Sequence, residues 1–293
     1  MIWLLNSLSW VFGKLPLRIA QNLGAGIGYT AYLFSSRKNE VDVRISECLN
    51  LERSQARSIQ KSMYRNLGYT VAEFLRMPHM DKDQVHDLIS FERTEQFPEP
   101  EKGFIALVGH TGNWELAAAS TPLLDPAIYV NLVVKPLKPA SFYDWVNQVR
   151  AKWGTTIHDR RESPKKLLKL MKQGENIVFV LDQNARRHRG IFVDFFGRPA
   201  CTYDTLAQFA ALSGHPILPV LCRRDPETRK LIVTVGEEVP GPVDRSEEEV
   251  RRVTQACTKR LEDFIRRYPD QWIWMHRRWK TKQLADSTQF CTD

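Results

Sequence analysis

Short apolar runs separated by amphipathic segments are the feature that most limits how this chain can fold. Three of these runs, at 103–108, 129–134 and 176–181, are uncharged and have the length of single strands. An apolar run of this length without polar alternation is typical of a strand buried on both faces. Two further strands are predicted at 215–220 and 231–235.

Amphipathic helices are predicted around these strands. They cover 51–77, 142–153, 165–173, 205–213 and a segment that opens with the capping sequence Ser246-Glu247-Glu248-Glu249. Because strands and helices alternate, the chain is expected to form an α/β domain whose sheet is covered on both faces.

The composition narrows the class of protein. The chain has 293 residues with 42 Lys and Arg against 34 Asp and Glu, which gives a net charge of +8. A mean hydropathy of −0.38 excludes a polytopic membrane protein, and the positive charge favours an anionic partner. The five cysteines are widely spaced and form no C-x-x-C pair, so neither a zinc site nor a disulfide framework is expected.

The first 40 residues differ from the rest of the chain. The segments 1–12 and 19–36 are almost free of charge, and Glu40 is the first acidic residue. A cleaved signal peptide needs basic residues ahead of its apolar run, and here they follow it. We therefore expect an uncleaved membrane anchor, formed by one marginal span or by an interfacial helix pair.

A buried helical hairpin of the globular core is the alternative for this segment. If it is an anchor, the basic pair Arg37 and Lys38 would keep the following domain on the cytoplasmic side. The predicted division is then an anchoring segment at 1–40 and a catalytic domain at 41–293.

The turn after the first buried strand carries the clearest chemical motif. It reads Gly109-His110-Thr111-Gly112-Asn113-Trp114-Glu115 and leads into a helix. Open α/β sheets bind ligands at this place. Glu115, folding back from the first helical turn, would fix the tautomer of His110 and leave its other nitrogen free as a base. Gly112 and the helix N-terminus would offer N–H groups to an oxyanion; the alternative is a capping histidine beside a solvated glutamate.

Motifs for a serine nucleophile, a metalloprotease, a Walker A loop and a dinucleotide turn are absent from the sequence. A His–carboxylate pair without a nucleophile suits direct transfer. In that reaction the base deprotonates an acceptor hydroxyl, which attacks an activated acyl group.

A second polar pair, Asp182-Gln183, directly follows the strand at 176–181. The basic run 186–189 comes next, and the segment 150–198 holds 12 Lys and Arg against five Asp and Glu. This charge indicates either a solvated basic face or a phosphate-binding rim. Near the C-terminus, 272–280 mixes aromatic and basic residues, which fits a nucleic acid, a membrane interface or anchoring to the core.

Taken together, these motifs resemble those of the bacterial lipid A biosynthesis late acyltransferases, the lauroyl and myristoyl transferases of the lysophospholipid acyltransferase superfamily. The H-x4-E motif alone is common, but the ordered combination is specific. The resemblance covers nearly the whole chain and rests on Gly109-His110, Asn113-Trp114-Glu115, Val134-Lys135-Pro136, Asp182-Gln183, the run 193–202, Leu218-Pro219 and the run 274–280.

The resemblance implies a mixed, largely parallel central sheet like that of glycerolipid acyltransferases. It implies transfer of a fatty acyl chain from acyl carrier protein to a hydroxyl of a phosphorylated lipid A precursor. The reaction would take place on the cytoplasmic face of the inner membrane, without metal or cofactor and without nucleic acid as partner. His110 would be the general base and Glu115 its orienting partner. The residues expected at the acceptor pocket are Gly112, Asn113, Lys135, Arg160, Asp182 and Gln183.

Lys135 departs from the family pattern, in which we expect arginine. Lysine keeps the charge but loses bidentate phosphate geometry, which leaves the acceptor open. Other membrane glycolipids or aminolipids, with acyl-CoA or acyl carrier protein as donor, and a lipid esterase or thioesterase are the enzymatic alternatives. The alternative outside catalysis is a membrane-tethered protein that binds anionic lipid or nucleic acid.

Overall fold

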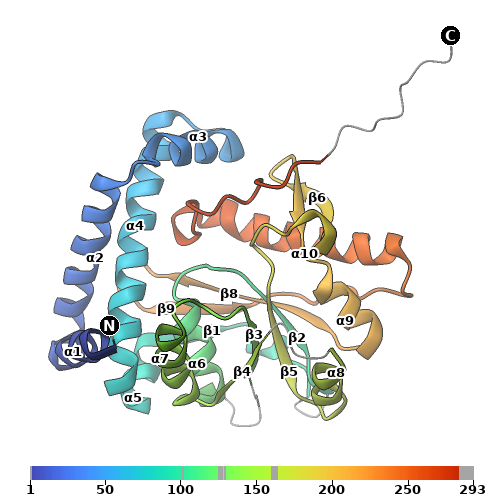
Figure 1. Ribbon diagram of the computed structural model, residues 1–293, viewed down its shortest axis with the longest axis horizontal. Helices are drawn as coiled ribbons and strands as arrows, with labels where there is room; N and C mark the ends of the chain where they lie inside the picture. The colour runs from blue at the N-terminus through green and yellow to red at the C-terminus, as the bar shows by residue number, and fades with distance from the viewer. Residues whose placement is uncertain (1, 100–101, 125–127, 129, 160–163, 284–293) are drawn as a thin grey trace.

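The computed structural model describes residues 2–99, 102–124, 128, 130–159 and 164–283. Within this part of the chain, a seven-stranded sheet has the order β1-β9-β8-β2-β5-β3-β4, and β6 and β7 form a separate hairpin (Figure 1). The strands are β1 Ile89–Glu92, β2 Ile105–Val108, β3 Val130–Val134, β4 Thr155–Asp159, β5 Asn176–Val180, β6 Ile191–Phe195, β7 Arg198–Thr202, β8 Ile217–Arg224 and β9 Leu231–Val235.

The helices are α1 Ile2–Lys14, α2 Leu17–Phe34, α3 Lys38–Leu49, α4 Arg53–Arg76, α5 Lys82–Leu88, α6 Trp114–Leu124, α7 Ala140–Ala151, α8 Pro164–Lys172, α9 Thr205–Ser213 and α10 Glu247–Arg267. Short 3₁₀ turns are η1 Met77–His79, η2 Thr94–Gln96, η4 Arg187–Arg189 and η5 Pro269–Gln271.

The sheet is largely parallel, as expected. Strand β2 lies between β8 and β5, parallel to both, and among the described strand pairs of this sheet only β8–β9 is antiparallel. The parallel register aligns Val108 of β2 with Val180 of β5. The two turns that follow these strands therefore lie side by side at the same edge of the sheet.

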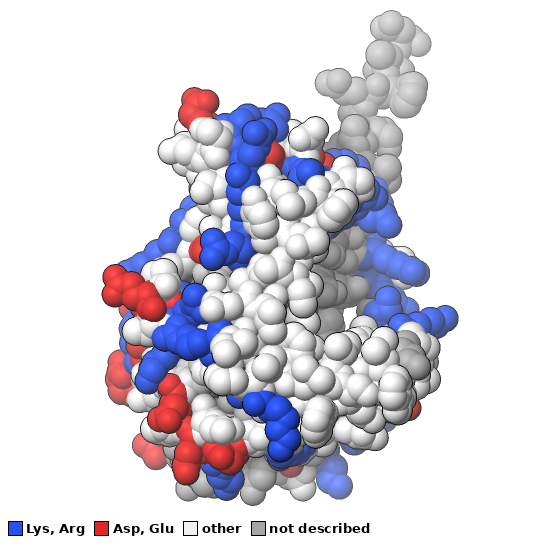
Figure 2. All heavy atoms as spheres, turned by 90° about the vertical axis from the view of Figure 1, so that its left-hand side faces the viewer, with Lys and Arg blue, Asp and Glu red and all other residues white. Residues whose placement is uncertain are grey.

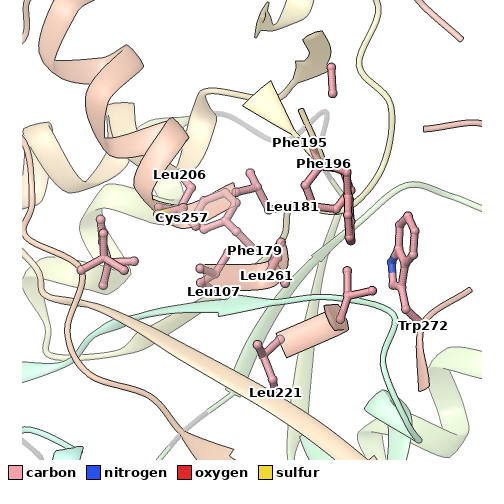
Figure 3. Packing of buried hydrophobic residues seen from close by; sticks show 14 of the residues in the cluster. Leu107, Phe179, Leu181, Phe195, Phe196, Leu206, Leu221, Cys257, Leu261 and Trp272 are labelled. Atoms are coloured by element: carbon pink, nitrogen blue, oxygen red, sulfur yellow. The ribbon is translucent and has the colours of Figure 1, made fainter. Parts of the chain in front are cut away.

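Helices cover both faces of the sheet, which confirms the predicted α/β architecture (Figure 1). On one face, side chains from β2, β5 and β8 pack against α9 and α10 (Figure 3). The strand residues alternate along the chain, so that every second side chain points to this face. The labelled members of this core include Leu107, Phe179, Leu221, Leu206, Cys257 and Leu261.

Helix α2 lies along α4 at one side of the molecule, and α1, seen nearly end-on in Figure 1, packs near the C-terminal end of α4. The α2–α4 crossing is close because glycines meet there. A Cβ on Gly24 would lie 2.3 Å from the carbonyl oxygen of Gly68, and one on Gly28 would lie 2.1 Å from that of Tyr64. Gly26 faces away from α4, with nothing within 4 Å of its Cβ position. The glycines at 24 and 28 are thus explained by helix packing.

The outer faces of α1 and α2 are apolar and exposed. Among the described residues, eleven of the fifteen exposed large hydrophobic side chains belong to these two helices, including Trp3, Trp10 and Ile27. Figure 2 shows this side of the molecule as a broad uncharged surface with Lys and Arg around it and with Asp and Glu along its left and lower-left margin. The described part of the chain contains no helix that is both long and apolar enough to span a membrane.

Candidate active site

His110 and Asp182 meet at the edge of the sheet because of the β2–β5 register. Each residue lies two positions beyond the paired residues Val108 and Val180. The Asp182 carboxylate accepts a hydrogen bond from the backbone N–H of His110 at 2.9 Å and contacts the ring nitrogen Nδ1 at 2.9 Å. The two strands therefore deliver a histidine and its carboxylate partner from positions 72 residues apart.

Asp182 is 4% exposed and has a third partner, the indole N–H of Trp272 at 2.9 Å. Burial by itself raises the pKa of this carboxyl. The charge of His110 and the hydrogen bonds from His110 and Trp272 lower it more, so the pKa of Asp182 lies below its usual range. Asp182 is therefore an anion beside His110.

Burial also disfavours the charged form of His110 and lowers its pKa. The charge of Asp182 and the hydrogen bond to it outweigh burial, so that the pKa of His110 is raised above its ordinary value. Because Nδ1 faces Asp182, Nε2 is the nitrogen left to act as a base. This nitrogen lies 3.5 Å from the amide nitrogen of Gln183, and the His110 side chain is 23% exposed.

A cavity of about 860 Å³ opens beside His110. Much of its wall is apolar and comes from β2, β3, β5 and α6. Phe104, which directly precedes β2, and Ala106 and Val108 of β2 line it in alternation, and this row of side chains leads along the strand to His110. The residues that continue this apolar wall are Ala117, Ala118, Val130, Leu132, Val178, Val180 and Phe97.

Polar and basic side chains line other parts of the same cavity. Gln183 and Lys135 come from the ends of β5 and β3, and η4 contributes three more residues. A pocket with an apolar wall and a cationic rim suits a ligand with a hydrocarbon chain and an anionic group. The lining residues of η4 are Arg187, His188 and Arg189.

The structure corrects the expected position of Glu115. Its carboxylate does not serve Nδ1 of His110, which Asp182 occupies, but pairs with Arg150 of α7. The Arg150 guanidinium contacts the two Glu115 oxygens at 2.8 and 2.6 Å. Glu115 lies in the first turn of α6, where its Oε1 also accepts the indole N–H of Trp114 at 3.1 Å. The Glu115–Arg150 pair still lines the cavity with His110.

Gly112 and Asn113 also differ from their expected roles. The N–H of Gly112 donates to the carbonyl of Gln271 at 3.0 Å, so an oxyanion would have to compete for it. Asn113 is fully buried: its Oδ1 caps α6 at the N–H of Leu116, and its Nδ2 donates to Glu73. Both residues shape the turn that holds His110. Gly112 has φ +54°, and a Cβ there would lie 2.7 Å from the carbonyl oxygen of Cys222.

The remaining expected site residues divide into two groups. Lys135 and Gln183 line the cavity, whereas Asp182, also expected at the acceptor pocket, does not line it and contacts His110 instead. Arg160 lies outside the described residues. In the part of the chain that is described, no three His, Cys, Asp or Glu side chains are grouped so that they could hold a metal ion.

Two residues at this centre have no local signal in the sequence. Arg150 lies 35 residues after Glu115, and the opposite charges alone do not reveal their pairing. Trp272 belongs to the C-terminal aromatic and basic run, but its contact with Asp182 spans 90 residues. Of the three settings considered for this run, the structure shows anchoring to the core: Trp272, Trp274 and Arg278 are all buried.

Comparison with known proteins assigns the family. The sequence profile of the bacterial lipid A biosynthesis acyltransferases matches residues 1–281. The chain belongs to this family. It is therefore an acyltransferase of the late lipid A type, as the resemblance of its motifs predicted.

Three relatives illustrate the range of this match. The lipid A biosynthesis lauroyltransferase of Escherichia coli is 24% identical over 96% of this chain and 91% of its own length. The lipid A biosynthesis acyltransferase of Haemophilus influenzae is 21% identical over 96% of this chain and 87% of its own length. A phosphatidylinositol mannoside acyltransferase of Mycolicibacterium smegmatis is 24% identical over 71% of this chain and 67% of its own length.

Proposed function

We propose that this acyltransferase moves a fatty acyl chain from the thioester of acyl carrier protein to a hydroxyl of a phosphorylated lipid A precursor. His110 acts as the general base, and Asp182 orients it. The observation that carries the proposal is the position of the His110–Asp182 pair at the mouth of an apolar cavity with a cationic rim. The pair needs no enzyme nucleophile, because the acceptor hydroxyl attacks directly.

His110 and Asp182 are sufficient for the proton transfers that the reaction requires. Nε2 of His110 takes the proton from the acceptor hydroxyl as its oxygen bonds to the thioester carbonyl carbon. Asp182 stabilises the imidazolium that forms. When the carbon–sulfur bond breaks, the imidazolium returns the proton to the leaving thiolate. Gln183, beside Nε2, is placed to donate a hydrogen bond to the substrate oxygen on which charge develops.

The apolar wall of the cavity accommodates the acyl chain in this scheme. It runs between the sheet and α6, where Ala117 and Ala118 leave room that larger side chains would fill. The chain would lie along β2, with its thioester end at His110. Burial of a hydrocarbon chain contributes about 0.8 kcal/mol per methylene, enough to select for length.

In this scheme the basic side chains of the rim bind the anionic parts of both substrates. Lys135, Arg187 and Arg189 line the cavity and are exposed to solvent. Their charge suits the phosphates of the acceptor and the acidic surface of a carrier protein. We place the enzyme on the cytoplasmic face of the inner membrane, bound through the exposed apolar faces of α1 and α2 as an interfacial helix pair.

Mass spectrometry of lipid A tests the reaction. A strain lacking this gene should lose one secondary acyl chain, and the mass difference gives the chain length. Expression of the wild-type gene should restore the chain, and His110→Ala should not, although the protein still binds membranes. The exposed His86 provides the matched control, because His86→Ala removes a histidine that does not line the cavity. Full restoration by His110→Ala would contradict the mechanism.

The mycobacterial relative supports a second acceptor, a phosphorylated mannolipid. An assay of the purified enzyme with an acyl carrier protein thioester and each acceptor in turn distinguishes the two proposed acceptors. An acylated mannolipid without acylated lipid A precursor would replace the first proposal. Free fatty acid as sole product would indicate a thioesterase that uses water as the acceptor.

A further inference from the structure

The C-terminal segment after α10 returns to the turn that carries His110. Thr111 and Trp272 form an isolated antiparallel bridge, and the carbonyl of Gln271 accepts the N–H of Gly112. The side chain of Gln271 accepts the backbone N–H of Arg224 on β8 at 2.8 Å. Gln271 and Trp272 thus fix the segment both to the turn that carries His110 and to β8.

This attachment brings the indole of Trp272 to Asp182. Trp272 is 1% exposed, belongs to the core shown in Figure 3, and packs edge-on against Phe195 with ring centroids 5.7 Å apart. Its Nε1–H donates to Oδ2 of Asp182 at 2.9 Å, the same oxygen that accepts the backbone N–H of His110. Two donors therefore hold Oδ2, and Oδ1 is left facing Nδ1 of His110.

We infer that Trp272 is a positioning residue for the acyl transfer: its indole N–H fixes the rotation of the Asp182 carboxylate and moderates how strongly that carboxylate attracts the imidazolium of His110. The inference rests on the proposed role of His110 as base. Trp272 does not line the cavity and acts only through Asp182.

The direction of the effect follows from charge. A hydrogen bond from a neutral N–H stabilises the carboxylate anion and withdraws part of its negative charge from Oδ1. Without the hydrogen bond from Trp272, the Asp182 carboxylate would attract the protonated His110 ring more strongly, and the pKa of His110 would rise. The neutral base would then form only at higher pH, and the freed carboxylate would orient the ring less well.

Other charged groups around the pair remain in place. Glu115 and Arg150 face His110 from α6 and α7, and act on its pKa in opposite directions. His276 and Arg278 face Asp182 from the C-terminal segment. None of these four groups is altered by a change of the Trp272 ring, so a shift can be attributed to the indole N–H.

Trp274 provides a matched control. It lies in the same segment, is fully buried, and stands against Trp272 with ring centroids 4.8 Å apart. Its indole N–H donates to the carbonyl of Pro269 at 2.7 Å and not to Asp182. Trp272→Phe and Trp274→Phe therefore remove the same group from similar surroundings, but only the first removes it from the carboxylate.

The test is an NMR titration of the His110 imidazole in the full-length chain labelled with ¹⁵N-histidine, with His110→Gln used for assignment. Trp272→Phe should raise the pKa of His110 by about half a unit, a fraction of the value of a hydrogen bond to a charged group. Trp274→Phe should leave it in place. An unchanged or lowered pKa in Trp272→Phe, or an equal shift in both variants, overturns the inference.

A second variant tests the inference even if Trp272→Phe fails to fold. Benzothienylalanine at position 272 keeps the bicyclic shape and replaces only the N–H by sulfur, and it should give the same shift. The kcat/KM profile then relates this to activity: its acid limb should move to higher pH with the titration. If the titration shifts and the activity limb does not, the proposed base is wrong while the contact of Trp272 with Asp182 stands.

Discussion

At the scale of single residues, two carboxylates near His110 have different tasks. Asp182 contacts the ring nitrogen Nδ1, and Glu115 holds Arg150 through both of its oxygens. A carboxylate on Nδ1 sets the tautomer in which Nε2 is the base. The distance along the sequence favours Glu115 for that task, but the register of the two strands gives it to Asp182.

A pair of isosteric variants separates these tasks. Asp182→Asn should lower kcat by about a thousandfold, because the amide no longer holds the reactive tautomer. Glu115→Gln should cost about tenfold, since it only loosens a partly buried ion pair near the site. The measurement is single-turnover acyl transfer with saturating donor. Equal losses in the two variants, or a larger one in Glu115→Gln, would return the orienting role to Glu115.

The pH dependence follows from the same contact. Asp182 raises the pKa of His110, and only the neutral ring accepts a proton, so kcat/KM should rise with pH through a pKa above the ordinary histidine value of about 6.5. In Asp182→Asn the raising charge is gone, and the residual activity should rise at a lower pH. If the rise in kcat/KM occurs at the same pH in Asp182→Asn as in the wild type, a group other than His110 controls it.

A small residue in the cavity wall should determine acyl chain length. Ala118 on α6 lies in the apolar wall, so the ring in Ala118→Phe would occupy space that the acyl chain needs. Donors that are too long should lose about fourfold in kcat/KM for each methylene excluded, while short donors should react as in wild type. A competition assay with donors of graded length measures this. An unchanged preference would place the chain elsewhere.

The sequence predicted much of this site and missed its connections. His110, Asp182 and Gln183 were recognisable as polar residues after buried strands, because parallel strands place their carboxyl ends at one edge. Their pairing was not recognisable, since β2 and β5 are neighbours although β3 and β4 lie between them in the chain. Asn113 is polar and lies in the turn, but only the structure shows that its side-chain amide is hydrogen-bonded to the start of α6 and to Glu73.

At the scale of elements, the strongly patterned segments were predicted almost to their ends. The helix expected at 51–77 is α4 at Arg53–Arg76, and 205–213 is α9. The elements that were missed have weak local patterns. Strand β4 contains His158 and Asp159, and the hairpin β6–β7 lies outside the main sheet and contains Pro199. Their pairing partners decide their structure, and a single sequence does not state those partners.

The α2–α4 crossing gives a prediction with an internal control. In Gly24→Ala the added methyl would meet the backbone of Gly68, which cannot rotate away, and should cost about 1–3 kcal/mol of stability. Gly26→Ala places the same methyl in open space on the same helix and should gain up to about 1 kcal/mol through helix propensity. Denaturant unfolding compares them. Equal midpoints for both variants would show that the helices do not pack this closely.

At the scale of the whole molecule, the apolar helices and the cavity beside His110 are separate features. No residue of α1 or α2 lines the cavity. They are connected through buried polar contacts, because Gln21 of α2 and Asn113 of the turn that carries His110 both donate to Glu73 at 2.8 Å. Arg224 neutralises Glu73 through two contacts of 2.6 and 2.7 Å. The anchoring role of residues 1–40 and the division at residue 40 stay predictions.

Membrane binding can therefore be separated from chemistry. Trp10 and Ile27 are 58% and 61% exposed on α1 and α2, and burying each in lipid should contribute about 1.5–3 kcal/mol. The double variant Trp10→Asp/Ile27→Asp should thus lose at least about a hundredfold in partition to anionic vesicles, measured by sedimentation. Val243→Asp is the control, since Val243 is 86% exposed but lies in the loop before α10.

The double variant should still acylate a detergent-dispersed acceptor, because the His110–Asp182 pair and the cavity are unchanged. Wild-type vesicle binding by the double variant would exclude these helices as the membrane-binding face, and a parallel loss of activity in detergent would show that the variant is misfolded rather than detached.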